Sequence, residues 1–308
     1  MKRFRTLAIV VLLILLVTVF EKTESRPLAY NLKKNRATIN VSGDVFKNIS
    51  LEAKAAYVFD ARTGAVLYAQ NENVPLPLAS LSKLMTVLVA LDSMPTSSVI
   101  SIAARALEEE GDSGLLAGEK WTLWNLAQFT LTTSSNDGAS AIASAIAPLL
   151  ATDESGDQGF IKAMNLKARL LNLESIHFFN ETGLDLNILS AGGYGSAKDV
   201  TVLVRHIWGR YPALMETTSY IAPEVFSFGG IHKILNSNRE VDKIPGILLS
   251  KTGFTDIAGG NLTVAFDAGI GRPIFITVLG STLEGRFADA QKLVSLSIEA
   301  VKKEDFAQ

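Results

Sequence analysis

The chain contains 308 residues, 48% of them hydrophobic, which is enough to bury a substantial core as one large domain or two small ones. Its formal net charge of −2 excludes the basic footprint typical of nucleic-acid-binding proteins, so we expect no nucleic-acid partner. It has no cysteine, which excludes disulfides, thiolate metal sites and a cysteine nucleophile, and its histidines lack metal-ligand spacing. We therefore expect neither a metal nor a cofactor.

Residues 1–22 have the features of an export signal. Lys2, Arg3 and Arg5 precede a run from Leu7 to Phe20 that is apolar apart from one threonine. No small-x-small cleavage site follows, which favours an uncleaved signal-anchor over a cleaved signal peptide, although the run is shorter than the roughly 20 residues that span a bilayer. Both alternatives predict an exported protein on the extracytoplasmic side, in a periplasm or cell wall, and an anchor would attach it to the membrane.

The remaining chain divides into a linker and a folded domain. Residues 23–50 are polar and predict a linker, with a strand or helix within 37–46 left open. Residues 51–308 are predicted to form the folded domain, which opens with a hairpin around the turn at Gly64. Strands are predicted at 55–60, 65–70, 246–252, 260–266 and 273–280, and helices at 80–93, 121–132, 140–150, 159–172, 197–208 and 286–303.

This order of elements predicts the fold class. Strands at both ends of the domain, with helices between them, cannot form an alternating βαβ array. We therefore predict an α+β fold with a mostly antiparallel sheet, which is built from both chain ends around a helical insert.

Ser80 and Lys83 stand three residues apart at the start of a predicted helix. A serine hydroxyl is a poor nucleophile until a base takes its proton, and residues at i and i+3 share one helix face. A solvated lysine has a pKa of about 10.4, but burial and a second nearby cation both lower it, and Lys251 is the candidate cation. The first helical turn also offers backbone N–H groups to an oxyanion. Taken alone, the pair favours an ordinary helix start with a serine cap and a surface lysine.

Two further motifs can complete a site with this pair. Ser134 and Asn136 lie in a break between helical patterns, where a loop can direct side chains into a cleft. Lys251, Thr252 and Gly253 end a strand-like run. In an edge strand, the ammonium and hydroxyl groups could bind a carboxylate, and the glycine would allow close approach of a substrate backbone. Each motif alone is also typical of an ordinary turn or strand end.

The three patterns S-x-x-K, S-x-N and K-T-G each occur once, in this order, a combination similar to the signature of penicillin-binding proteins and class A β-lactamases. The surrounding residues 79–86 and 251–256 resemble the low-molecular-mass penicillin-binding proteins, the D-alanyl-D-alanine carboxypeptidase family. Weaker similarities lie at 160–165, 177–185 and 196–199, where we expect structural roles and a helix cap at Asp199. The resemblance runs from about Ala55 to the C-terminus. It implies a β-lactamase/transpeptidase-like fold with a single catalytic domain at 51–308.

The resemblance also implies roles for the site residues. Ser134 would relay a proton to the leaving amine, and Asn136 would hold both Lys83 and the substrate amide. The backbone N–H groups of Ser80 and Phe254 would form the oxyanion hole. The chain has Ser135 where carboxypeptidase relatives usually have glycine, a departure that we expect to alter loop stiffness more than chemistry.

The implied activity is that of a serine D-alanyl-D-alanine carboxypeptidase on peptidoglycan stem peptides, with β-lactams as covalent inhibitors of Ser80. A DD-endopeptidase that cleaves cross-links is the main alternative. A β-lactamase would need a carboxylate to activate the deacylating water, and residues 181–185 only approach the E-x-x-L-N string. A catalytically silent scaffold is disfavoured because every motif is retained.

Overall fold

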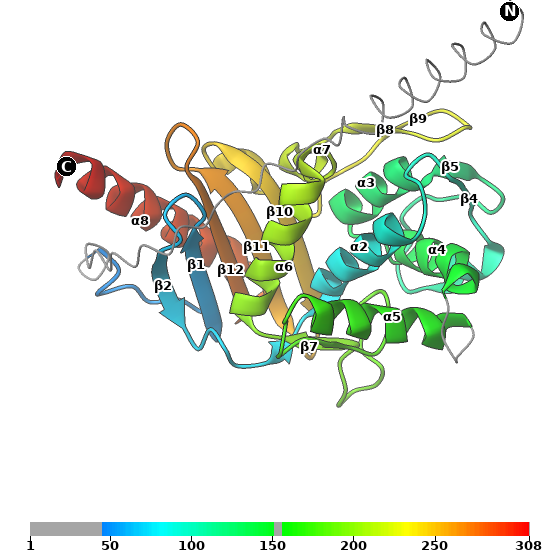
Figure 1. The fold of residues 1–308 in the computed structure, drawn as a ribbon, viewed down its shortest axis with the longest axis horizontal. Coiled ribbons are helices and arrows are strands. Elements are labelled where there is room, and N and C mark those ends of the chain that lie inside the picture. Colours follow the sequence, from blue (N-terminus) through cyan, green and yellow to red (C-terminus); the bar gives the residue numbers. More distant parts are fainter. Residues whose placement is uncertain (1–44, 151–155, 308) are drawn as a thin grey trace, which may run out of the picture. The chain divides into compact units, whose positions relative to one another are not determined.

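The centre of the fold is a five-stranded antiparallel sheet with the order β10-β11-β12-β1-β2. The computed structural model describes residues 45–150 and 156–307, and both ends of this part of the chain contribute strands to the sheet (Figure 1). The prediction of an α+β fold with a sheet assembled from both chain ends is therefore confirmed. Strand β10 lies at one edge of this sheet, so one side of its backbone is unpaired.

The elements that were predicted lie close to their predicted positions, whereas the short strands β3 to β9 and helix α7 were not predicted. The strands are β1 (Ala55–Asp60), β2 (Val66–Gln70), β3 (Leu76–Pro77), β4 (Val99–Ser101), β5 (Lys120–Thr122), β6 (His177–Phe178), β7 (Gly193–Gly195), β8 (Glu224–Phe226), β9 (Ile231–Lys233), β10 (Ile247–Thr255), β11 (Gly259–Asp267) and β12 (Pro273–Ser281). The helices are α2 (Lys83–Ser93), α3 (Leu123–Thr133), α4 (Asn136–Ile146), α5 (Gly156–Leu170), α6 (Ala197–Arg210), α7 (Pro212–Glu216) and α8 (Gly285–Ala307).

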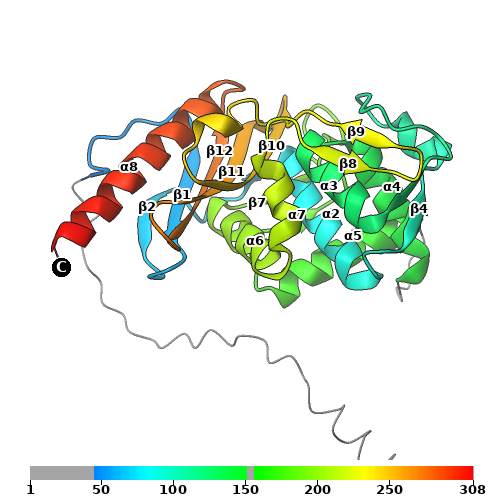
Figure 2. The same ribbon diagram turned by 90° about the horizontal axis from the view of Figure 1, so that it is seen from above.

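Helices cover both faces of the main sheet because its strands are apolar on both faces. In β1, Ala55 and Tyr57 pack into one buried cluster, and Ala56 and Val58 pack into another. This alternation follows from the two-residue repeat of a strand. Helix α6 contacts β1 and β12, and α8 contacts β11 and β12. Figure 2 shows these two helices on opposite sides of the sheet.

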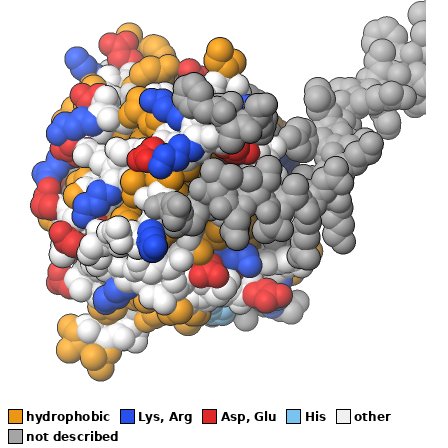
Figure 3. Space-filling model, turned by 90° about the vertical axis from the view of Figure 1, so that its left-hand side faces the viewer, with side chains coloured by type: hydrophobic (Ala, Val, Ile, Leu, Met, Phe, Trp, Pro, Cys, Tyr) orange, Lys and Arg blue, Asp and Glu red, His pale blue; other side chains and the backbone are white. Residues whose placement is uncertain are grey.

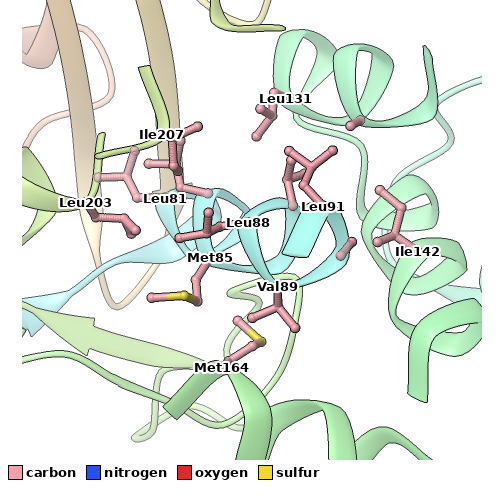
Figure 4. Close-up of a cluster of buried hydrophobic side chains, with 14 of the residues drawn as sticks. Leu81, Met85, Leu88, Val89, Leu91, Leu131, Ile142, Met164, Leu203 and Ile207 are labelled. Carbon is pink, nitrogen blue, oxygen red and sulfur yellow. The ribbon is translucent and has the colours of Figure 1, made fainter. Parts of the chain in front are cut away.

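Helix α2 forms the centre of the helical region beside the sheet. Its residues from Lys83 to Leu91 are all buried. Met85 and Val89 face Met164 of α5, and Leu203 and Ile207 of α6 lie beside its first turns, with α3 and α4 on its other side (Figure 4). Because α2 contacts helices on every side, its first residue is fixed in a region from which water is excluded.

One predicted helix cap is wrong. The N-cap of α6 is Ser196, whose hydroxyl accepts a hydrogen bond from the Asp199 backbone N–H over 3.1 Å. The Asp199 carboxylate instead accepts bonds from the backbone N–H and the hydroxyl of Ser175, at 2.8 and 2.6 Å. Serine is a preferred N-cap, and it stands one turn before the aspartate. Asp199 therefore attaches the start of α6 to the preceding loop.

The predicted export signal at 1–22 and most of the predicted linker lie outside the described residues. Within the described end of that linker, Phe46 is buried and stacks on Tyr68, with ring centroids 5.4 Å apart. None of the helices in the described part of the chain has the length and apolar character that a membrane crossing needs. On the face shown in Figure 3, Lys and Arg side chains are interspersed with Asp and Glu, in keeping with the small net charge.

Candidate active site

Ser80 lies on a short 3₁₀ turn, Ala79–Ser82, which leads directly into α2. The sequence predicted a single α-helix from Ser80 onward. In the observed 3₁₀ turn, side chains three residues apart eclipse one another, so Ser80 and Lys83 lie closer than they would on an α-helix. The preceding residue, Ala79, has a left-handed backbone with φ 48°. For a residue with a Cβ, this conformation costs of the order of 1–3 kcal/mol, and such strain is often found at functional sites.

Lys83 is completely buried, and its ammonium nitrogen has three oxygen neighbours. Its Nζ lies 2.8 Å from Ser80 Oγ, 2.6 Å from Asn136 Oδ1 and 2.7 Å from the Thr182 carbonyl oxygen. The last two atoms can only accept hydrogen bonds. When Lys83 is a neutral amine, its two N–H groups are therefore directed to Asn136 and Thr182. The lone pair is left facing Ser80, whose hydroxyl then donates.

Burial lowers the pKa of Lys83 to about 7, and the nearby carboxylates of Glu181 and Glu109 oppose this effect. A large fraction of the lysine is then neutral near neutral pH. The sequence predicted that a second cation, Lys251, would help to lower this pKa. The structure shows desolvation as the main cause, because α2 carries Lys83 into the core.

The Ser134-Ser135-Asn136 turn connects α3 to α4. Ser134 ends α3 with a left-handed backbone, φ 65°, and Asn136 is the first residue of α4. Between them, the buried Ser135 is the N-cap of α4 and accepts a bond from the Gly138 backbone N–H over 2.8 Å. A left-handed residue followed at once by a cap reverses the chain sharply. The turn thereby presents Asn136 to Lys83 on α2.

The edge strand β10 forms the opposite wall. Lys251, Thr252 and Gly253 lie within this strand, which continues to Thr255 instead of ending at the motif. Lys251 Nζ donates to Ser134 Oγ and to the Thr252 carbonyl oxygen, both over 2.7 Å. A Cβ on Gly253 would stand 2.9 Å from the Leu78 carbonyl oxygen and 3.3 Å from the Ser80 backbone nitrogen. Glycine is therefore required for β10 to pack against the turn that carries Ser80. The two predicted oxyanion donors are the backbone N–H groups of Ser80 and Phe254. This packing places the Ser80 nitrogen beside Gly253, the residue before Phe254.

Lys251 is also completely buried, and its pKa is lowered well below the usual value. The causes are burial first, then the charges of Lys83 and Arg286. Thus all four predicted residues of the first two motifs, and the three of the K-T-G motif, converge on one place. The Phe254 side chain is exposed, so a role in the site would have to come from its backbone.

Comparison with known proteins identifies the family. The family model described as D-alanyl-D-alanine carboxypeptidase matches residues 42–282. The chain belongs to the D-alanyl-D-alanine carboxypeptidase family. Its antiparallel sheet with flanking helices is the penicillin-binding protein and transpeptidase fold.

Similar family members include both carboxypeptidases and endopeptidases. The chain is 29% identical to the D-alanyl-D-alanine carboxypeptidase DacF of Bacillus subtilis over 80% of its own length and 62% of that protein. It is 31% identical to a D-alanyl-D-alanine endopeptidase of Pseudomonas aeruginosa, covering 79% of the chain and 76% of that protein. Among solved structures, a penicillin-binding protein of Listeria monocytogenes in its ampicillin-bound form has a TM-score of 0.69 at 28% identity, covering 81% of this chain and 98% of that one.

Sequence reasoning missed four contributors to this carboxypeptidase-family site. The Thr182 and Glu110 carbonyl oxygens bind Lys83 and the Asn136 amide, respectively. The Ser237 hydroxyl accepts a bond from Thr252 over 2.7 Å, and Arg286 donates to the Gly253 carbonyl oxygen, also over 2.7 Å. Backbone carbonyls leave no signature in a sequence. The stretch at 177–185 was noted, but only for a structural role.

A cavity of about 680 Å³ lies beside the candidate active site, next to α5. Two of its lining residues also interact with Lys83, Glu109 through its charge and Thr182 through its carbonyl oxygen. The cavity therefore lies next to the buried lysine. Its lining combines carboxylates, amides and aromatic rings. The lining residues are Glu109, Gln158, Ile161, Lys162, Asn165, His177, Phe178, Phe179, Asn180, Glu181, Thr182, Leu184, Asp185 and Leu186.

Proposed function

We propose that the protein is a serine-type D-alanyl-D-alanine carboxypeptidase that acts on peptidoglycan stem peptides through an acyl-enzyme on Ser80. One observation carries the proposal. A buried lysine with a pKa of about 7 holds its nitrogen 2.8 Å from Ser80 Oγ, while its other two contacts are obligate acceptors. This arrangement provides a nucleophile and a base in hydrogen-bonding distance.

In acylation, Lys83 takes the proton of Ser80 as Oγ bonds to the carbonyl carbon of the penultimate D-alanine. The C–N bond breaks, and the leaving D-alanine nitrogen takes a proton from the Ser134 hydroxyl, which contacts Lys251 over 2.7 Å and is reprotonated with the proton that Lys83 removed from Ser80. The products are an ester on Ser80 and a free amine, with no net change in protons. Water then cleaves the ester, with Lys83 again accepting a proton, and Ser80 is regenerated.

The β10 wall would bind the C-terminal carboxylate of the peptide through Lys251 and Thr252. An arriving carboxylate favours the charged form of Lys251, because opposite charges in a buried site attract strongly. In the free protein, the neighbouring charges of Lys83 and Arg286 act in the other direction. Binding of a carboxylate therefore raises the pKa of Lys251. β-Lactams, which carry a comparable carboxylate beside a reactive amide, would acylate Ser80 in the same way.

The direct test is labelling of the full-length protein with a fluorescent penicillin, together with release of D-alanine from a pentapeptide. The wild-type protein should become labelled, and Ser80→Ala should not. Ser93→Ala is a matched control, because Ser93 bonds the Val89 carbonyl at the far end of α2. Equal labelling of the wild type and Ser80→Ala rejects the proposal.

A DD-endopeptidase is the second candidate, favoured by the similarity to proteins named D-alanyl-D-alanine endopeptidase in Pseudomonas aeruginosa and Escherichia coli. The chemistry at Ser80 is the same, and only the leaving amine differs. Digestion of defined muropeptides separates the two activities. A carboxypeptidase removes D-alanine from monomeric pentapeptides, whereas an endopeptidase converts cross-linked dimers to monomers.

We infer from the proposed substrate that the protein acts outside the cytoplasm, with residues 1–22 as its attachment to the membrane. The basic start and apolar run of this segment support export. N-terminal sequencing of the protein from a membrane fraction tests the anchor. Recovery of the intact N-terminus supports it, and a new N-terminus beyond residue 20 identifies a cleaved signal peptide.

A further inference from the structure

The loop of residues 109–114 is fastened to the Ser134-Ser135-Asn136 turn by the hydroxyl group of Ser113. Ser113 Oγ lies 2.7 Å from Ser135 Oγ and donates to Asp137 Oδ2 over 2.8 Å. The Ser113 backbone N–H donates to the same carboxylate oxygen over 3.3 Å. Ser135 and Asp137 are both buried. The loop is thus joined to the start of α4 through one serine side chain and its backbone.

The same loop orients the amide of Asn136. Asn136 Nδ2 donates to the Glu110 carbonyl oxygen over 2.6 Å, while Oδ1 accepts from Lys83 over 2.6 Å. The Glu110 carbonyl accepts only from the NH₂ end, so this contact keeps the oxygen end of the amide directed to Lys83. One N–H of Asn136 remains for the substrate amide. The loop therefore supports one of the three oxygen neighbours of the catalytic base.

A second group on the loop acts on Lys83 through its charge. The Glu109 carboxylate raises the pKa of Lys83, as does Glu181 from the 177–186 loop. Lys251 lies near Lys83 on β10, and the charge of Lys83 contributes to the lowering of its pKa. The loop thus supplies two effects in the same direction, since an acceptor and a negative charge both favour the ammonium form of Lys83.

We propose that Ser113 and Ser135 are positioning residues that hold the 109–114 loop against the active site, so that Glu110 orients Asn136 and Glu109 remains near Lys83. The proposal rests on the function of Lys83 as the base for Ser80. It gives Ser135 a role beyond capping α4. Releasing the loop makes Lys83 a weaker base and loosens one of the groups that bind the substrate amide.

The test compares Ser113→Ala and Ser135→Gly with the wild type, by the rate of acylation with a fluorescent penicillin at pH values on both sides of neutrality. Ser113→Ala removes both hydroxyl contacts, and Ser135→Gly removes one of them and replaces the N-cap with a residue that caps nearly as well. We expect the plateau rate to fall about two- to tenfold for Ser113→Ala and less for Ser135→Gly, by the usual strength of such hydrogen bonds. The midpoint of the pH profile moves to lower pH in both variants.

The controls separate positioning from a loss of folded protein. Ser113→Thr retains a hydroxyl and should restore the rate and the midpoint, and Ser93→Ala should match the wild type. Loss of folded protein lowers the amount of labelled enzyme but leaves the pH midpoint unchanged, and thermal unfolding reports it directly. Normal rates and an unmoved midpoint in Ser113→Ala overturn the proposal. Failure of the underlying function looks different, because the wild type itself then remains unlabelled.

Discussion

The two buried lysines of the site lie on elements that are built differently. Lys83 begins a helix in the core, and its oxygen neighbours come from Ser80, Asn136 and Thr182, on three separate segments of the chain. Lys251 lies on an edge strand, where one of its two acceptors is the carbonyl of its neighbour Thr252. Both are desolvated to the same degree.

Their electrostatic surroundings differ in sign. Two carboxylates oppose the effect of burial on Lys83, and its pKa remains at about 7. Two cations add to the effect of burial on Lys251, and its pKa falls well below the usual value. In the proposed mechanism, one residue type therefore serves two purposes in one site: a base that exchanges protons near neutral pH, and a group that becomes charged when an anion arrives.

The largest expected effect comes from Lys83→Arg. An arginine retains the positive charge but cannot give up its proton, so it removes the base alone. Acylation by a fluorescent penicillin should fall about 10²- to 10⁴-fold, the usual contribution of general base catalysis. The matched variant Lys251→Arg keeps a cation for the carboxylate and should lose less. Equal losses in the two variants contradict the division of roles.

The pH profile of the wild type is the next test of the comparison. The neutral form of Lys83 is the base, and its pKa is lowered to about 7, so the acylation rate should rise with pH through this value and then level off. Two pH units below the midpoint, the fraction of neutral Lys83 should be about 100-fold lower than on the plateau, and the acylation rate should fall with it. Stopped-flow acylation measures the profile. A rate that is flat on the acidic side of neutrality excludes Lys83 as the titrating base.

Gly253→Ala tests the contact between β10 and the turn that carries Ser80. The added Cβ meets Leu78 O at 2.9 Å and Ser80 N at 3.3 Å, and it forces β10 away from the Ser80 turn. We expect unfolding to become easier by about 1–3 kcal/mol, as for other overpacked sites, and acylation to slow by about tenfold. Gly269→Ala is the control, because its Cβ would meet no atom within 4 Å. If Gly253→Ala matches Gly269→Ala in thermal unfolding and in labelling rate, the packing of β10 against the Ser80 turn does not depend on the glycine.

The smallest effect is expected from Glu181→Gln. Removing this carboxylate takes away a charge that raises the pKa of Lys83, so the midpoint of the acylation profile moves to lower pH. The plateau rate should change little, because the Thr182 carbonyl that binds Lys83 is part of the backbone. Glu224→Gln, on the exposed face of β8, should leave the midpoint in place. A shift to higher pH contradicts the assigned sign.

Short-range patterns predicted most of the fold well. Strand β1 has the predicted bounds. Strands β10, β11 and β12 and helix α8 begin within three residues of their predicted starts. Apolar periodicity and turn residues specify such elements locally. The start of α2 was less accurate, since an α-turn and a 3₁₀ turn share the same apolar pattern. The Asp199 cap was wrong because serine and aspartate compete for that position.

The sequence by itself determined which side chains could do the chemistry: a serine and a lysine three residues apart, a serine–asparagine turn, and a lysine–threonine–glycine strand. Only the tertiary structure decided how they act. It placed the carbonyls of Thr182 and Glu110 on Lys83 and Asn136, and it set opposite charges around two equally buried lysines. The physical reason is that backbone acceptors and the electric fields of distant charges cannot be recognised from the residue types in a sequence. They arise when segments far apart in the chain, here 99 residues for Lys83 and Thr182, are packed together without water.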